Sequence, residues 1–334
     1  MLKIRNYKAG MKIKKPCVIR GMPDDVYHSS IGLSNSGLKT LLDCPAKYYF
    51  KYLSGDYTPK EKPSFKIGKA CHKYILEGRK AFEEQYWYNP YSEYKKDELV
   101  AIFKSIFDYD NVVSKLTVRE LTELLLDKAE IIPKEIHLNL SELNQVIGMS
   151  KMINSDERAK NAFSQKGESE LSLFWQDEET GIWLKCRPDF LPYDCKFVPD
   201  YKTAVSANPR TFYGDFLKFG YFVQAAMYRQ GIKAVTGIDV ESFFFIVQEK
   251  EEPFISQPFL PSMRLVDWGD KVIRNGIQKY VECQESGLWP GYTDKVVELS
   301  IEFAPDEIVG GYDLDNAVAY APYSIDRILS KYEV

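Results

Sequence analysis

The sequence predicts an α/β protein with a central mixed sheet flanked by helices. Short runs rich in aromatic and β-branched residues are typical of buried strands, and they occur at residues 171–175, 183–190, 197–202 and 243–248. A stretch with helical periodicity separates the third run from the fourth. Strands followed by a helix and a further strand favour a mixed sheet covered by helices.

The N-terminal part is predicted to be helical. Ser34 or Ser36 can cap a helix whose apolar stripe begins at Leu38, because a serine oxygen accepts from the first free amides of a helix. Pro45 suits the first turn of a second helix. A third helix is expected near residues 68–78.

Two longer helical regions are expected further along the chain. Residues 97–163 have helical periodicity and are acidic, with no recognisable motif, so they could be a family-specific insertion or an assembly surface. Residues 264–287 form another predicted helix, which ends at Gly287.

Two short stretches have the composition of a metal site. They are Arg187-Pro188-Asp189 and, eleven residues after Asp189, Asp200-Tyr201-Lys202-Thr203. Two acids can hold Mg²⁺ while an ammonium positions the attacking water, as phosphodiester hydrolysis requires. The residues between the acids have a polar centre and two apolar arms, which predicts a β-hairpin with Asp189 and Asp200 side by side on paired strands. Asp200 and Lys202 would project from the same face. The pattern indicates a nuclease.

Two other acid-x-Lys triplets occur in this chain, of which 28% is charged. Glu93-Tyr94-Lys95 has no strand pattern around it, and Asp194-Cys195-Lys196 lies at the expected turn, where Asp is favoured. We interpret both as solvated charges.

Two further motifs lie on predicted helices. His72 stands among apolar residues within Gly68–Gly78, and Gln224 and Tyr228 fall on one helix face at i, i+4. A histidine in such a setting can be a core residue rather than a ligand, and Tyr228 can be part of an apolar helix face. Both alternatives remain open.

The order of these motifs resembles the RecB-type branch of the PD-(D/E)XK nucleases, and more closely the RecE-like exonuclease VIII nuclease domain. The pattern is Gly-x-x-x-His, Arg-Pro-Asp, Asp-x-Lys-Thr and Gln-x-x-x-Tyr. Four other segments share the resemblance: Met22–His28, Leu33–Leu38, Cys44–Tyr49 and Thr180–Asp189. It spans roughly residues 21 to 300, with a poor match between about 85 and 135. The resemblance implies a PD-(D/E)XK restriction-endonuclease-like fold.

The same resemblance implies a set of metal ligands. Asp189 and Asp200 would bind the ion, with the carbonyl of Tyr201 as a possible third ligand. His72 would be a further ligand or would stabilise the ligands without contacting the ion itself. Glu170 is a weaker candidate, since it can equally be a solvated acid at a strand end.

The remaining implied residues act on water and DNA. Lys202 would orient or deprotonate the water, while Gln224 and Tyr228 would hold the DNA backbone or brace the lysine. The expected cofactor is Mg²⁺, with Mn²⁺ as an alternative.

The resemblance also implies a substrate and partners. It implies 5′→3′ digestion of one strand from double-stranded DNA ends, often by a ring-shaped tetramer. It further implies recombination with a RecT-like single-strand annealing protein, in a phage or prophage setting. Alternatives are an endonuclease or single-strand nuclease of the same superfamily, and a catalytically silent DNA-binding protein.

Charge is distributed unevenly along the chain. The whole has 44 basic and 48 acidic residues, a net charge of −4, which argues against a general polyanion binder. Residues 1–80 hold 17 Lys and Arg against 6 Asp and Glu, or +11, so the remainder has 27 against 42, or −15. The basic first twenty residues could contact phosphates, or could simply aid solubility.

Lysines and aromatic residues alternate between Lys47 and Tyr52, as they do on surfaces that bind nucleic acid. Helical spacing would bury some of these rings.

Length and composition favour one elaborated domain. The chain has 334 residues, of which 45% are hydrophobic. We expect five parts: a basic N-terminal arm (1–20), a basic helical section with the His motif (21–80), a helical section that could be an insertion (81–165), the catalytic sheet and helices (166–305), and a C-terminal tail (306–334). No apolar run is as long as a membrane span, and the N-terminus is too basic for a signal peptide. We expect a soluble protein in the cytoplasm of a bacterium or a phage-infected host.

The cysteines give neither a zinc module nor a disulfide framework. No Cys-x-x-Cys pair occurs among the six, which are Cys17, Cys44, Cys71, Cys186, Cys195 and Cys283. Some RecB-type nucleases bind an iron–sulfur cluster through one early cysteine, at a position like Cys44, and three clustered late ones. Only Cys283 is late here, so we predict no iron–sulfur cluster and interpret Cys44 as a small buried residue.

Overall fold

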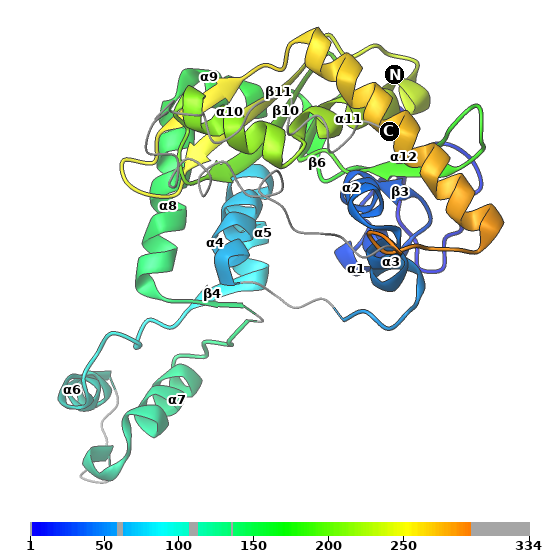
Figure 1. Ribbon diagram of the computed structural model, residues 1–334. Coiled ribbons are helices and arrows are strands. Elements are labelled where there is room, and N and C mark those ends of the chain that lie inside the picture. The colour runs from blue at the N-terminus through cyan, green and yellow to red at the C-terminus, as the bar shows by residue number, and fades with distance from the viewer. Residues whose placement is uncertain (1, 59–62, 107–112, 135, 295–334) are drawn as a thin grey trace, which may run out of the picture. The chain divides into compact units, whose positions relative to one another are not determined.

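The computed structural model describes residues 2–58, 63–106, 113–134 and 136–294 (Figure 1). The chain divides into two compact units. The first comprises Met1–Lys60, Asn161–Val247 and Gln257–Val334, and the second comprises Glu61–Lys160 and Gln248–Ser256. One elaborated nuclease domain over residues 1–334 stays a prediction. The predicted tail from residue 306 lies outside the described residues.

The larger sheet of the first unit is mixed. Its five strands lie in the order β1 (Ile4–Asn6), β2 (Cys17–Arg20), β7 (Ser172–Gln176), β8 (Trp183–Cys186) and β3 (Leu33–Ser34). β1 runs parallel to β2 and β3 parallel to β8, whereas β7 is antiparallel to both of its neighbours. The basic first twenty residues therefore include two strands of this sheet, with Val18 and Ile19 in the core. Together with the helices described below, this sheet confirms the predicted mixed α/β class.

Two smaller sheets lie largely in the first unit. β10 (Phe197–Ala204), β11 (Ser242–Glu249) and β12 (Ser256–Phe259) form one in that order, and β6 (Gly167–Ser169) pairs antiparallel with β9 (Phe190–Pro192) in the other. The run expected as one strand from 183 to 190 is thus two strands. The break falls at Pro188, which has no amide hydrogen to give to a ladder.

The predicted hairpin was wrong in its pairing. The chain does turn between β9 and β10, where the Cys195 amide donates to the Pro192 carbonyl at 3.0 Å. However, β9 pairs with β6, and β10 pairs with β11. Pro192 in β9 and Pro199 in β10 both lack the amide hydrogen that such a ladder requires, which accounts for the difference.

The first helices begin where the sequence predicted. Of the two candidate serines, Ser34 caps α2 (Asn35–Asp43), and its hydroxyl accepts from the Gly37 amide at 3.1 Å. Pro45 opens α3 (Pro45–Tyr48). A π-helical turn, η1 (Tyr49–Leu53), continues from α3 and was not predicted.

Two long helices pack closely against each other and the sheet. α11 (Tyr221–Thr236) contacts α12 (Met263–Ser286), which ends at Gly287 as predicted. A Cβ on Gly269 of α12 would lie 2.6 Å from the Phe222 carbonyl oxygen, so only glycine permits this crossing. A Cβ on Gly231 of α11 would lie 2.6 Å from the Trp175 ring, which holds α11 against β7. Two shorter helices belong to the same unit, α1 (Asp24–Ser29) and α10 (Pro209–Lys218).

The second unit is largely helical, as predicted for most of residues 97–163. Its elements are α4 (Pro63–His72), η2 (Lys73–Glu77), α5 (Gly78–Gln85), β4 (Tyr86–Tyr88), α6 (Lys96–Ile106), η3 (Val113–Lys115), α7 (Val118–Lys128), β5 (Ile136–Leu138) and α8 (Leu140–Ser155). α9 (Glu157–Phe163) follows at the unit boundary. Capping boxes begin α7 at Thr117 and α8 at Asn139. In the part of the chain that the structure describes, no helix combines the length and the apolar character needed to cross a membrane.

Candidate active site

β10 carries an acid and a lysine into the interior of the first unit. Asp200 is fully buried, the Lys202 side chain is 17% exposed, and the Lys202 ammonium forms an ion pair with the Asp200 carboxylate. Alternation along the strand places these two residues on one face. Tyr201 points the other way and is fully buried, with its ring edge-on to Phe163 at 6.4 Å. A charged pair at this depth is costly unless other polar groups satisfy it.

Asp189 and Glu170 lie next to this pair because of two backbone arrangements. The Tyr201 amide donates to the Asp189 carboxylate at 2.7 Å, which holds Asp189 beside β10. The β6–β9 register sets Ser169 opposite Phe190, so the next residues outward are Glu170 and Asp189. Carboxylate oxygens of Glu170 and Asp189 lie within 4.8 Å of each other.

Glu170 has an unusual backbone conformation. Its φ is +57°, in the left-handed region that non-glycine residues rarely adopt, and its amide donates to the Asp189 carbonyl at 3.3 Å. Such conformations cluster at functional sites, where the surrounding structure maintains them. This favours a site role over a solvated strand-end acid.

α11 supplies the polar group that holds Asp200. The Gln224 side-chain amide donates to Asp200 Oδ1 at 2.9 Å in a buried position. Gln224 therefore braces the acid, whereas the sequence interpretation had it bracing the lysine or holding DNA. One turn later, Tyr228 packs edge-on against Phe243 at 5.7 Å. The Lys202 ammonium lies 5.5 Å from the centre of the Tyr221 ring.

Burial and neighbouring charges shift the titration of these groups. Burial raises the pKa of the Asp189 carboxyl, although the Lys202 ammonium opposes this shift. Burial also acts to lower the pKa of Lys202, but the Asp200 and Asp189 carboxylates outweigh it, and the pKa of Lys202 is raised. Burial raises the pKa of the Tyr228 hydroxyl. The lysine is thus held in its charged form.

A cavity of about 320 Å³ opens beside Glu170. Glu170, Gln224 and Tyr228 line it together with Lys185 and Arg187. A ligand in this cavity would meet Glu170, Gln224 and Tyr228 together with two cations.

Sequence reasoning did not assign roles to Lys185 and Arg187. Lys185 Nζ donates to the carbonyl of Tyr27 at 2.8 Å, and Arg187 pairs with Asp24 at 2.6 Å. Both cations therefore hold the α1 segment against the sheet. The available signal was the Met-Pro-Asp-Asp-Val-Tyr-His segment, whose Asp24 is the partner of the arginine.

The remaining candidates belong to other segments of the chain. His72 is the last residue of α4, in the second unit, and its role as a ligand stays a prediction. Glu93 and Lys95 are exposed, as expected for solvated charges. Cys44 is buried, as expected.

The residues of the first unit fit a divalent cation. Glu170, Asp189 and Asp200 contribute three carboxylates, while Lys202 contributes one ammonium. Burying an excess of negative charge is unfavourable, and a hard cation with oxygen ligands offsets it. The backbone carbonyl of Tyr201 as a ligand stays a prediction.

Comparison with known proteins places this arrangement in a family. A family model described as "PDDEXK-like domain of unknown function (DUF3799)" matches residues 34–299. A search of curated proteins found no match.

Two solved structures are similar to this chain. One is a "Putative exonuclease" from Eubacterium rectale, with a TM-score of 0.53 and 13% identity, covering 87% of this chain and 97% of the other. At this identity the likeness concerns the fold. The other, SSO0001, has a TM-score of 0.25 and 12% identity, covering 69% of this chain and 90% of the other, and supports no argument.

The family match includes every candidate residue from His72 to Tyr228. The chain therefore belongs to the PDDEXK-like domain family DUF3799.

Proposed function

We propose that this protein is a metal-dependent DNA exonuclease. The observation that carries the proposal is the buried cluster of Asp189, Asp200 and Lys202, held by Gln224, in a chain of the PDDEXK-like family. Two acids and a lysine on adjacent backbone segments are the groups that phosphodiester hydrolysis needs.

The proposed metal ligands are the oxygen groups of the cluster. Asp189, Asp200 and the carbonyl of Tyr201 would hold Mg²⁺ or Mn²⁺, with Glu170 as a further carboxylate and His72 as a further candidate. When bound, the ion would supply Lewis-acid polarisation of the phosphodiester and a more acidic water.

The protein's own side chains would position the reaction. Lys202 would orient the attacking water and stabilise the negative charge that develops on the phosphoryl oxygens. Gln224 would fix the Asp200 carboxylate through its bond of 2.9 Å. Tyr228, which lines the cavity of about 320 Å³, would contact the DNA backbone.

The finer specificity rests on the resemblance to RecE-like enzymes. We propose that the substrate is a double-stranded DNA end, digested 5′→3′ on one strand. By the same resemblance, the protein would act in the cytoplasm as a ring-shaped oligomer. It would supply single strands to an annealing protein in recombination, in a phage or prophage setting.

The test is degradation of linear duplex DNA beside a covalently closed circle, with and without Mg²⁺. The linear substrate should bear a label on one 5′-phosphorylated strand. We expect metal-dependent loss of the linear DNA alone, with Asp200→Asn inactive. Asp194→Asn is the matched control, because it removes an exposed acid of the neighbouring triplet.

Other outcomes would change the assignment. Cut circles would indicate an endonuclease, and release of label from single-stranded DNA alone would indicate a single-strand nuclease. If neither substrate were cut while both were bound, the protein would be a catalytically silent DNA-binding protein.

A further inference from the structure

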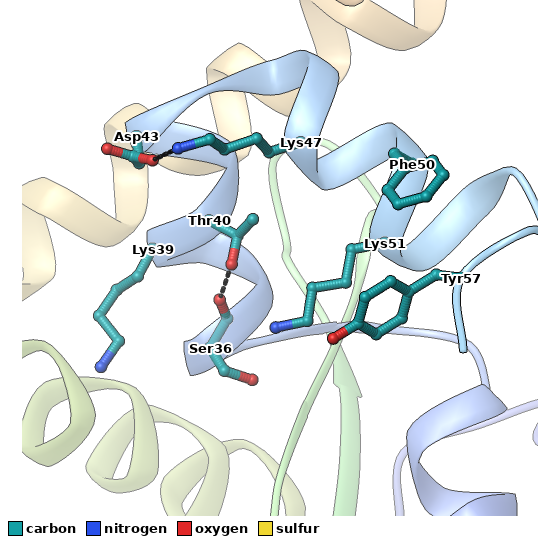
Figure 2. A pocket seen from close by; sticks show the side chains of 8 residues that line it. All are labelled: Ser36, Lys39, Thr40, Asp43, Lys47, Phe50, Lys51 and Tyr57. Carbon is teal, nitrogen blue, oxygen red and sulfur yellow. Dashed lines mark hydrogen bonds and ion pairs between the residues drawn. The ribbon is translucent and has the colours of Figure 1, made fainter. Parts of the chain in front are cut away.

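A second cavity, of about 530 Å³, lies over α2, α3 and η1 in the first unit (Figure 2). Its lining combines three lysines, two aromatic rings, two hydroxyls and one acid. These residues are Ser36, Lys39, Thr40, Asp43, Lys47, Phe50, Lys51 and Tyr57. We call it the lysine pocket.

The rings of the lysine pocket face solvent. Phe50 is 52% exposed and Tyr57 is 38% exposed, and their centres lie 5.9 Å apart in an edge-to-face arrangement. In the preceding helical turn, Tyr48 is 5% exposed and belongs to the core. Exposed aromatic side chains that cluster in this way mark interaction sites. Phe50 also lies on η1, and π-helical turns are frequent at functional sites.

The lysine pocket has an excess of positive charge. Its acid, Asp43, pairs with Lys47 at 3.0 Å. Lys51 makes no ion pair with any residue that the structure describes. Instead its ammonium lies 5.9 Å from the centre of the Tyr57 ring, and Figure 2 shows it extending toward Ser36 beside that ring. A cation and a ring on the same wall can hold a phosphate and a base together.

Lys39 connects the lysine pocket to the candidate active site. Its ammonium donates to the Phe219 carbonyl at 2.6 Å, two residues before Tyr221, whose ring lies beside the Lys202 ammonium. Burial, together with the Lys202 charge, lowers the pKa of Lys39 to about 8. The Lys39 side chain thus reaches from the lysine pocket to the segment just before α11.

We propose that the lysine pocket binds a short single-stranded segment of DNA next to the candidate active site. Lys39 and Lys51 contact its phosphates, and Phe50 and Tyr57 stack on its bases. The inference rests on the proposed function, because it assigns a strand to that site. The inference goes beyond the proposed function because it names the surface that holds the unpaired nucleotides.

The chemistry of the pocket favours a single strand. A duplex stacks its base faces on one another, so exposed protein rings can stack only on unpaired bases. A phosphate chain without bases would use the lysines but not Phe50 and Tyr57.

The test is binding of a fluorescently labelled oligothymidylate in EDTA, measured by anisotropy at several salt concentrations. We expect Phe50→Ala to weaken binding about fivefold or more, as loss of one stacked base does. We expect Lys51→Gln to reduce the slope of log K against log salt by roughly 0.7, the value for one phosphate contact on a single strand.

Lys271→Gln is the matched control for Lys51→Gln, since Lys271 also lies over a ring, that of Trp268, at 5.8 Å. Phe197→Ala is the control for loss of an exposed ring. Thermal melting would show that each variant is folded.

Each result bears on the inference separately from the nuclease proposal. Binding that is insensitive to both Phe50→Ala and Lys51→Gln would overturn the inference, whether or not the wild type cuts DNA. Inorganic polyphosphate that competes fully, with no effect of Phe50→Ala, would overturn it too, because the pocket would then bind any polyanion. Strand binding that needs both residues in a protein that never cuts DNA would support the inference and refute the nuclease.

Discussion

Two Asp-x-Lys triplets stand six residues apart, one around Cys195 and one around Tyr201, and they occupy opposite environments. Asp194 and Lys196 lie at the turn before β10, where Lys196 pairs with Glu241 at 2.7 Å and both side chains of that pair are about half exposed. Asp200 and Lys202 lie within β10, and the acid of that pair has no exposed surface. The same three-residue pattern therefore gives a solvated turn in one place and a buried charged cluster in the other.

The difference lies in the neighbours rather than in the triplets. Asp200 receives a bond from Gln224 on α11, and Asp189 is held nearby by the Tyr201 amide. Asp194 accepts only from the amide of Lys196, at 3.1 Å, among the hydrogen bonds found in the described residues. A carboxylate gains catalytic potential when burial and nearby charges shift its titration.

The largest expected effect concerns cleavage by lysine variants of the two triplets. Lys202→Ala should lower the cleavage rate on the order of a thousandfold or more, because it removes a group placed to stabilise charge in the transition state. Lys196→Ala should leave the rate nearly unchanged. Single-turnover rates on linear duplex DNA would measure this. The interpretation would be reversed if Lys196→Ala were the inactive variant.

A smaller effect is expected on the free energy of unfolding when the acid and the lysine of each triplet are replaced singly and together. Lys202→Met alone should cost about 3–5 kcal/mol, because it leaves the buried Asp200 carboxylate without its cation. Asp200→Asn alone should cost less, because the Asp189 carboxylate still acts on the Lys202 ammonium. The double variant should recover much of this loss, which gives a favourable coupling energy. Urea unfolding of the wild type, the two single variants and the double variant measures this double-mutant cycle. The corresponding cycle at Asp194 and Lys196 is the control. Additive losses at Asp200 and Lys202 would contradict the pairing.

The smallest expected effect compares two neighbouring lysines as pH rises. Lys39 has a pKa lowered to about 8, so in the folded protein it loses its charge between pH 7 and 9, whereas Lys202 keeps its charge. Oligothymidylate binding should therefore weaken several-fold over this range. Lys39→Arg should bind almost equally at both pH values, because arginine stays charged.

The lowered pKa of Lys39 also makes the free energy of unfolding depend on pH. The folded pKa of Lys39 lies below its unfolded value of 10.5, so the unfolded state binds more protons between pH 8 and 10.5. The contribution of Lys39 to stability thus increases as pH rises through this window. Replacement by methionine should remove that increase from the urea unfolding free energy, and an unchanged profile would argue against the shift.

Local signals predicted the helix boundaries. Ser34, Pro45 and Gly287 act through bonds or backbone preferences within a few residues, so their positions could be interpreted from the sequence. The face shared by Asp200 and Lys202 was also predictable, because strand alternation is local.

Long-range pairing was not predictable in the same way. The proximity of Glu170 to Asp189 follows from the β6–β9 register, which no local pattern specifies. The contact of Lys39 with Phe219 joins residues 180 positions apart, so no local pattern specifies it either. Pro192 and Pro199 were the available warning against a regular hairpin ladder.

Metal binding by triplet variants tests the central claim most directly. Mn²⁺ titration, followed by the electron paramagnetic resonance signal of the free ion, would compare the wild type with Asp200→Asn and Asp194→Asn. We predict that the wild type and Asp194→Asn bind Mn²⁺ alike and that Asp200→Asn loses at least tenfold in affinity. Equal binding by all three proteins, or loss confined to Asp194→Asn, would show that the buried cluster is not the metal site.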